Sequence, residues 1–243
     1  MRRFMVSLAI LAAISLAVGA GMASAAHSGY SLFGDAEIVT GGHPGNAVQL
    51  RSDPTPGWGG IDFDVAARTT FADLGTLATD YKFEADDTCA GGSPRFQVNV
   101  EDPVTGDSGN IFVYIGPPPA YTLCPMNTWV NTGDLLAGVN PIDTSQLVGG
   151  TFYDPYTAAL AKYGDYIVTG IQLVADGAWK FLDGEQTVFI DNTNIDGTVY
   201  TYDGDHARSK DNCKDGGWMD LVTDDGDRFK NQGDCVSYFN NGK

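Results

Sequence analysis

Hydrophobic and polar residues alternate along much of the chain after about residue 35, and this period of two indicates half-buried β-strands. The alternation is clearest in residues 61–65, 81–85, 96–100 and 111–115. Further strands are expected near Glu37 and Val48 and in residues 166–174, 187–191 and 198–202. Because these short strands follow one another almost without helices, we expect an all-β fold, an antiparallel β-sandwich of the jelly-roll type.

One segment departs from the strand pattern. Residues 157–163 contain good helix formers, and Asp154 and Pro155 lie shortly before them. We expect Asp154 to cap the helix and Pro155 to occupy its first turn, with Gly164 ending it in the left-handed conformation. The sequence therefore predicts one short crossover helix that covers a sheet.

The N-terminus has the three parts of a secretory signal. Residues 1–3 are basic at two positions, residues 6–22 are apolar and uncharged, and residues 23–25 are the small triplet Ala-Ser-Ala. This order predicts a signal peptide over residues 1–25 and a mature chain that begins near Ala26. No later stretch is apolar for long enough to span a bilayer, so we expect a secreted, extracellular protein with no membrane span in its mature chain.

The expected export of the protein determines how its cysteines are interpreted. Cys89, Cys124, Cys213 and Cys235 are even in number, and none belongs to a Cys-x-x-Cys pair. In an oxidising compartment this favours two disulfides over zinc or redox chemistry. Three pairings are possible, and we favour the sequential one, because each bond then closes a local unit.

Composition divides the chain at about residue 206. Residues 26–205 hold the continuous strand pattern and are expected to form one sandwich domain. Residues 206–243 are rich in Lys, Asp, Asn and Gly and contain the last two cysteines. Such a short segment has little core, so we expect a small C-terminal module stapled by its disulfide.

The charge excludes two classes of partner. The chain has 14 Lys and Arg against 31 Asp and Glu, for a net charge of -17. Nucleic acid and bare anionic lipid would be repelled by such a surface. Only four of the acidic residues are glutamates, and the other 27 are aspartates, which suit turns and oxygen-ligand metal sites.

Calcium is the cofactor that this aspartate content predicts. Asp86, Asp87, Asp203 and Asp205 lie in predicted loops and are the candidate ligands, since calcium prefers carboxylate and carbonyl oxygens. Residues 192–197 approximate the spacing of a helix-flanked calcium loop, but strands flank them here. An Asp-Gly hairpin turn is the simpler interpretation of that segment.

The chain shows three resemblances to known groups of proteins. Residues 89–96, 110–114, 168–174 and 184–192 look like a family of uncharacterised secreted bacterial proteins. Residues 188–192, Val-Phe-Ile-Asp-Asn, resemble the last strand of galactose-binding-like jelly-roll modules, many of which bind carbohydrate and several of which hold structural calcium. Residues 213–218 and 229–237 are similar to a short Cys-containing C-terminal segment of many secreted bacterial proteins.

A glycan-binding face needs exposed aromatic rings beside hydrogen-bonding groups. Trp58 lies among glycines that leave its ring uncovered, and Tyr121 follows a proline-rich loop. Ser93 and Arg95 lie where a loop enters a strand, and Arg95 could form a planar fork with a sugar hydroxyl or pair with Glu101 or Asp102. The other two tryptophans of the expected sandwich, at positions 129 and 179, are expected in its core.

These features favour a non-catalytic binding module for an extracellular glycan. A structural or adhesive surface protein without a small ligand is one alternative. A glycan-active enzyme is the other, and it would require two carboxylates that converge in a cleft. The glutamates are far apart in the sequence, and no catalytic residue is predicted.

Overall fold

The computed structural model of the protein describes residues 29–137, 140–203, 205–206, 210–214, 216–219, 221–223 and 228–240. The predicted signal peptide, residues 1–25, lies outside the described residues. Within them, no helix is both long and apolar enough to cross a membrane.

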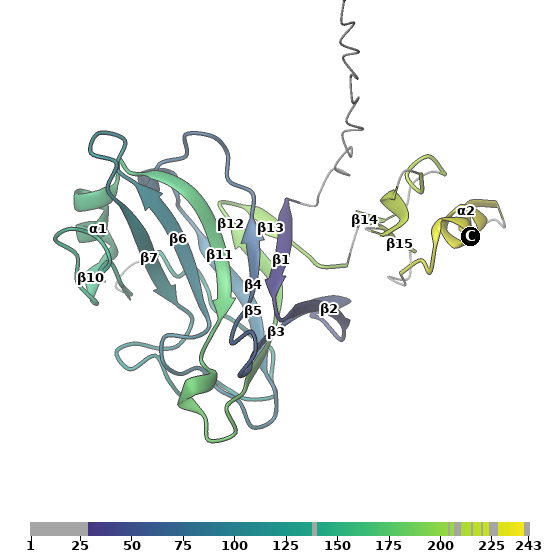
Figure 1. The fold of residues 1–243 in the computed structure, drawn as a ribbon, viewed down its shortest axis with the longest axis horizontal. Helices are drawn as coiled ribbons and strands as arrows, with labels where there is room; N and C mark the ends of the chain where they lie inside the picture. The colour runs from purple at the N-terminus through teal and green to yellow at the C-terminus, as the bar shows by residue number, and fades with distance from the viewer. Residues whose placement is uncertain are drawn as a thin grey trace, which may run out of the picture.

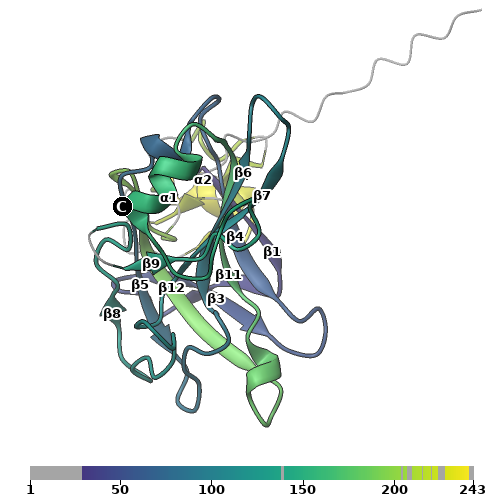
Figure 2. The same ribbon diagram turned by 90° about the vertical axis from the view of Figure 1, so that its left-hand side faces the viewer.

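Two antiparallel sheets pack face to face and form the predicted sandwich (Figures 1 and 2). Sheet A has the strand order β1-β4-β11-β6-β7, and its strands are β1 (Tyr30–Gly34), β4 (Gly59–Phe63), β11 (Ile167–Ala175), β6 (Arg95–Glu101) and β7 (Ser108–Tyr114). Sheet B has the order β2-β3-β12-β5-β8, and its strands are β2 (Ala36–Thr40), β3 (Asn46–Ser52), β12 (Gln186–Ile195), β5 (Leu77–Phe83) and β8 (Val130–Asn131). A further strand, β13 (Thr198–Tyr200), pairs with β12. The all-β prediction is confirmed.

The core lies between the sheets and follows the alternation of the sequence. On β6, Phe96, Val98 and Val100 are buried, whereas the residues between them face outward. Opposite them, Val188 and Ile190 of β12 are fully buried. Each such side chain stabilises the fold by roughly 1.5–3 kcal/mol. The same alternation therefore leaves a row of polar side chains on the outer face of each sheet.

A helical segment connects the two sheets at one side of the sandwich (Figure 2). After the short antiparallel pair β9 (Pro141–Ile142) and β10 (Asp154–Pro155), helix α1 spans Tyr156–Tyr163. Two 3-10 turns, Phe71–Asp73 and Ala178–Lys180, complete the connections of the sandwich. The predicted helix is therefore present, but its ends differ from the prediction.

Asp154 does not cap α1, and Gly164 does not end it in the left-handed conformation. Both carboxylate oxygens of Asp154 lie 2.8 Å from Lys162 Nζ, and one accepts a hydrogen bond from the Thr144 hydroxyl. Because the carboxylate binds Lys162 in the last turn of the helix and not the first backbone N–H groups, the N-terminus of α1 has no side-chain cap. Gly164 has φ of -55°, within the right-handed region.

The Asp196-Gly197 pair forms the predicted hairpin turn. It joins β12 to β13 with φ of 50° at Asp196 and 84° at Gly197, and Ile195 pairs with Thr198 across it. Two positive φ values in a two-residue loop are typical of the turns that match strand twist. The interpretation of this segment as a turn is confirmed.

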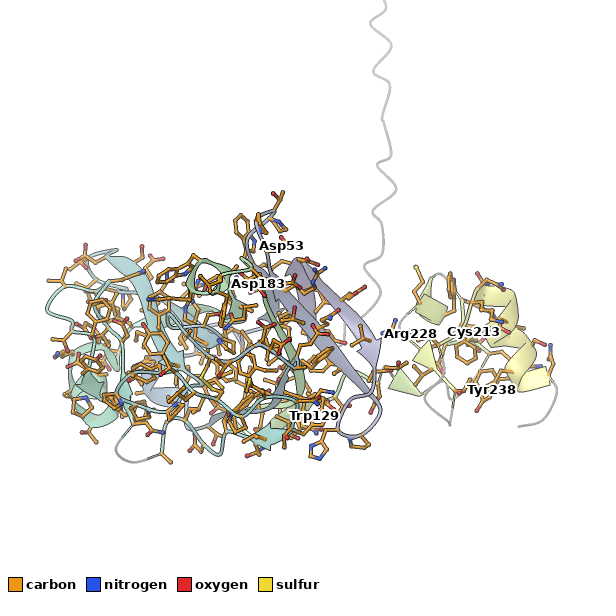
Figure 3. All side chains as sticks on the ribbon, turned by 90° about the horizontal axis from the view of Figure 1, so that it is seen from below. Asp53, Trp129, Asp183, Cys213, Arg228 and Tyr238 are labelled. Atoms are coloured by element: carbon orange, nitrogen blue, oxygen red, sulfur yellow. A yellow bond between two sulfur atoms is a disulfide. The ribbon has the colours of Figure 1, made fainter. Side chains whose placement is uncertain are left out.

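The cysteines pair sequentially, as predicted. Cys89 bonds Cys124, and Cys213 bonds Cys235. The second bond lies in the C-terminal segment, where the structure describes β14 (Asp205–His206), β15 (Leu221–Val222), a 3-10 turn (Gly217–Met219) and helix α2 (Gln232–Asn240). The sequence did not predict α2. These residues have a small core of their own around the disulfide, with Leu221 and Phe229 (Figure 3).

Candidate functional site

A hollow of about 300 Å³ opens among the loops that follow β5, β7, β9 and β11. The last of these loops carries the short helical turn at the lower end of the sandwich in Figure 1. Aromatic rings, small residues and one lysine form the walls. The lining residues are Ala90, Gly91, Gly92, Tyr114, Ala120, Tyr121, Thr122, Phe152, Tyr153 and Lys180.

Exposed aromatic side chains gather at this hollow. Among the described residues, the large hydrophobic side chains that remain exposed include four aromatic ones. Phe152 and Tyr153, which are 61% and 56% exposed, line the hollow. Trp179 is 69% exposed, and the Lys180 Nζ atom lies 4.2 Å from the centroid of its ring. Two of the four exposed rings thus line the hollow, and Trp179 borders it through the lining residue Lys180. We call this surface the aromatic hollow.

Two glycines shape the floor of the aromatic hollow. Gly91 and Gly92 have φ of 66° and 81°, which other residues rarely adopt. A Cβ atom at Gly91 would lie 2.8 Å from the Trp179 ring, and one at Gly92 would lie 2.8 Å from the Tyr114 ring. The absent side chains therefore allow both rings to approach the loop backbone, and Trp179 is held where it borders the hollow.

Tyr121, a predicted ligand residue, forms an inner wall. Its ring stacks on that of Tyr153 at 6.3 Å and contacts that of Tyr114 at 4.5 Å between centroids. Its hydroxyl donates to the Pro141 carbonyl, and burial raises the pKa of Tyr121 to about 12. The Tyr121 hydroxyl is consequently neutral at physiological pH, and its ring supports the exposed face of Tyr153.

Ser93 and Arg95 lie next to the hollow, but their polar atoms have internal partners. The Ser93 hydroxyl is buried and bonds the Gln186 side chain at 2.5 Å. Arg95 forms a two-pronged ion pair with Asp176 at 2.6 and 2.8 Å, rather than pairing with Glu101 or Asp102, and its guanidinium covers the Phe112 ring. These contacts position the β6 end of the loop that carries the two glycines.

The remaining tryptophans of the sandwich lie elsewhere. Trp58 is 49% exposed, as its glycine neighbours predict, but it does not line the aromatic hollow. Trp129 is half-buried and stacks on the His43 ring at 5.6 Å, so the prediction that it packs inside the sandwich is wrong. The same prediction for Trp179 is wrong too. Figure 3 shows Trp129 on the far side of the sandwich from Asp183, which shares a loop with Trp179.

The structure brings no three of the predicted calcium ligands together among the side chains that it describes. Within the described part of the chain, no group of three or more His, Cys, Asp or Glu side chains is arranged to hold a metal ion. Asp86 is exposed, and buried Asp87 accepts a hydrogen bond from the Thr187 N–H. Asp203 accepts one from the first residue of β3, and the side chain of Asp205 lies outside the described residues. Calcium binding stays a prediction, with no site assigned.

A separate group of charged residues lies on the outer side of sheet B. Asp80 and Asp191 face each other on β5 and β12, and the His43 Nδ1 atom lies 3.0 Å from Asp80. Burial opposes ionisation of Asp80, but hydrogen bonds from two asparagines and from His43 outweigh it and hold its pKa below the usual range. Asp191 is fully buried and accepts the backbone N–H groups of His43 and Asn192.

The pKa values of Asp80 and Asp191 are shifted in opposite directions. Burial, together with the nearby charges of Asp203 and Asp80, raises the pKa of Asp191 to about 6. The folded protein therefore retains a proton on Asp191 between about pH 4 and pH 6, where an unfolded aspartate is ionised. Because the folded state binds more protons in this window, the contribution of Asp191 to stability falls as the pH rises through it.

Replacing Asp191 with asparagine is expected to remove this pH dependence. From pH 4 to pH 6.5 the free energy of unfolding of the wild type should fall relative to that of Asp191→Asn, by at most about 3 kcal/mol for a shift of about two pKa units. Urea unfolding at several pH values, in a chelator so that no bound cation alters the charge, measures the difference. Parallel curves for the two proteins would contradict the assignment.

Sequence reasoning missed Phe152, Tyr153 and Lys180 of the aromatic hollow, and it expected Trp179 in the core. Their neighbours offered one signal, because Phe152 and Tyr153 form an aromatic pair between Gly149-Gly150 and Pro155, in a segment without strand alternation. The Gly91-Gly92 pair offered another, since adjacent glycines mark a close approach of other groups to the backbone. Neither signal identifies which loops meet.

Comparisons with known proteins add little. No protein-family model matches the chain, and no curated protein matches it. Among solved structures it is similar to an exo-beta-agarase, with a TM-score of 0.36 and 13% identity over 78% of this chain. The match spans 29% of the agarase chain. A likeness at this level carries no conclusion about function.

Proposed function

We propose that the protein is a secreted, non-catalytic module that binds a neutral extracellular glycan at the aromatic hollow. One observation carries the proposal: of the four exposed aromatic rings among the described residues, two line one hollow, and a third, that of Trp179, lies against its lining residues Gly91 and Lys180. Exposed apolar surface is costly unless a partner covers it, so a cluster of this kind marks a binding site. Planar rings beside donors such as Lys180 suit sugars, which have apolar faces and polar edges.

Electrostatics supports a neutral glycan. The chain carries a net charge of -17, which repels acidic polysaccharides at a distance. Lys180 is the sole charged residue among those that line the described hollow. A neutral sugar has no charge to desolvate when it docks there, and the rings offer apolar contact area.

The chemistry of the lining favours binding over hydrolysis. Glycoside hydrolysis requires a pair of carboxyl groups that flank the scissile bond. The side chains that line the described hollow include neither Asp nor Glu. Two acidic residues beside the lining are already engaged, since Asp143 accepts a hydrogen bond from the Tyr114 hydroxyl at 2.5 Å and Asp176 pairs with Arg95.

Electrophoresis of the native protein through gels that contain one polysaccharide each tests this function. We expect retardation by at least one neutral polysaccharide among agarose, xylan, mannan and β-glucan, and free migration in alginate and pectate. Bovine serum albumin, also acidic, is the reference for non-specific retardation. Unchanged migration in every neutral gel would refute the proposed function.

A further inference from the structure

The outer face of sheet A carries a second hollow, of about 580 Å³, that shares no residue with the aromatic hollow. Figure 1 views this sheet, with β4, β11 and β6 side by side at its centre. The three strands form the floor, and residues 64–68 form a rim. Polar side chains that point outward from the floor include Asp62, Asn99 and Gln172.

The strand register brings these side chains into neighbouring positions. Gln172 of β11 lies opposite Asp62 of β4 on one side and opposite Gln97 of β6 on the other. Asn99 follows two residues later on β6, so it points to the same face. Gly170, which lies opposite Asn99, leaves room for it, since a Cβ atom there would lie 2.9 Å from Asn99 Nδ2.

Gln97 orients its two amide neighbours. Its Nε2 group donates to Asn99 Oδ1 at 3.1 Å and to Gln172 Oε1 at 3.0 Å. The two acceptors are thereby fixed, and the Asn99 Nδ2 and Gln172 Nε2 groups face away from Gln97 as donors. Among the described residues neither of these donors has a hydrogen-bond partner, nor does the Asp62 carboxylate. Half-buried amide groups in fixed orientations are suited to bind a ligand.

We propose that this polar hollow is a second glycan site, which binds a neutral saccharide through the hydroxyl groups of its sugar rings. A hydroxyl both donates and accepts, so adjacent hydroxyls can bond the Asp62 carboxylate on one side and the Gln172 or Asn99 amide on the other. Anionic sugars are disfavoured, because the carboxylates of Asp62 and Asp64 outnumber Arg68, the one cation among the residues that line the described hollow. A peptide that adds to a sheet needs a free strand edge, whereas β4, β11 and β6 are all paired on both sides.

The side-chain amide signals of Asn99, Gln172 and Gln97 in NMR spectra report on the site directly. We expect fragments of at least one of agarose, xylan, mannan and β-glucan, each six sugars long, to shift the Asn99 and Gln172 signals at millimolar concentration. The shifts should persist in Trp179→Ala, because the two hollows share no residue. If none of these fragments moves either signal in the wild type, the proposal is overturned, whatever happens at the aromatic hollow.

A matched pair of variants tests the same point without assignments of the spectrum. Gln172→Ala should weaken binding of the active fragment to the polar hollow of Trp179→Ala by about three- to tenfold, as expected for one hydrogen bond to a neutral group. Gln49→Ala, on the outward side of β3 in the other sheet, is the control and should leave the affinity unchanged. Equal affinities for the two variants would overturn the proposal.

Discussion

Replacing Trp179 with alanine is expected to lower the affinity for a retained polysaccharide by about ten- to a hundredfold, with little change in the melting temperature. The affinity falls because a ring that becomes covered on binding contributes roughly 1.5–3 kcal/mol. The melting temperature should change little because Trp179 is 69% exposed in the free protein. Substitutions of exposed residues that leave the core and the buried polar groups intact usually change stability by less than about 0.5 kcal/mol. Affinity electrophoresis and thermal melts measure the two effects.

Trp58→Ala is the matched control for Trp179→Ala. Trp58 is also an exposed tryptophan, at 49%, but it does not line the aromatic hollow. The variant should retain the affinity of the wild type. If Trp58→Ala loses binding and Trp179→Ala keeps it, the site lies at Trp58, where sequence reasoning first placed it, and the assignment to the aromatic hollow is wrong.

Removing the disulfide between Cys89 and Cys124 should reduce both stability and binding. The bond joins the loop that holds Gly91 to the loop that holds Tyr121, so it fixes two walls of the aromatic hollow to each other. The sequence separation is 35 residues, and a loop of this size corresponds to roughly 3–4 kcal/mol on the chain-entropy model. For a domain of this size we expect Cys89→Ser/Cys124→Ser to melt about 10 °C lower.

The second disulfide supplies the control for the first. Cys213 and Cys235 belong to the small core of the C-terminal segment, not to the core of the sandwich. Cys213→Ser/Cys235→Ser should therefore leave the melt of the sandwich and its retention by polysaccharide unchanged. Equal losses of stability and retention in both double variants would show that the disulfides stabilise the chain without a specific role at the hollow.

The period of two located most of the strands because burial between two sheets leaves a direct mark on the sequence. Residues 96–100 alternate cleanly, and they lie within β6. The N-terminal cap of α1 was mispredicted because the preference of Asp for a capping position is weaker than its ion pair with Lys162. Asp154 is 5% exposed, and its bond to Lys162 satisfies the carboxylate better than an exposed helix end would.

The candidate site was harder to predict than the fold, because the aromatic hollow is formed by loops that are far apart in the sequence. The sequence predicted Tyr121 as an exposed ligand residue because it follows a proline-rich loop. Its side chain is only 8% exposed, and its ring supports that of Tyr153. Trp179 was expected in the core, since aromatic residues usually are, but it follows β11 in a short helical turn that leaves the sheet. The exposure of both residues depends on strand register and on which loops meet. Local sequence patterns do not contain that information.

Titration of the protein with fragments of its retained polysaccharide, observed through the indole N–H signals of its four tryptophans, tests the central claim most directly. Binding at the aromatic hollow predicts a saturable shift of the Trp179 signal, while the Trp129 signal, on the far side of the sandwich, stays in place. A saturable shift of Trp58 or Trp129 with Trp179 unmoved would contradict the account.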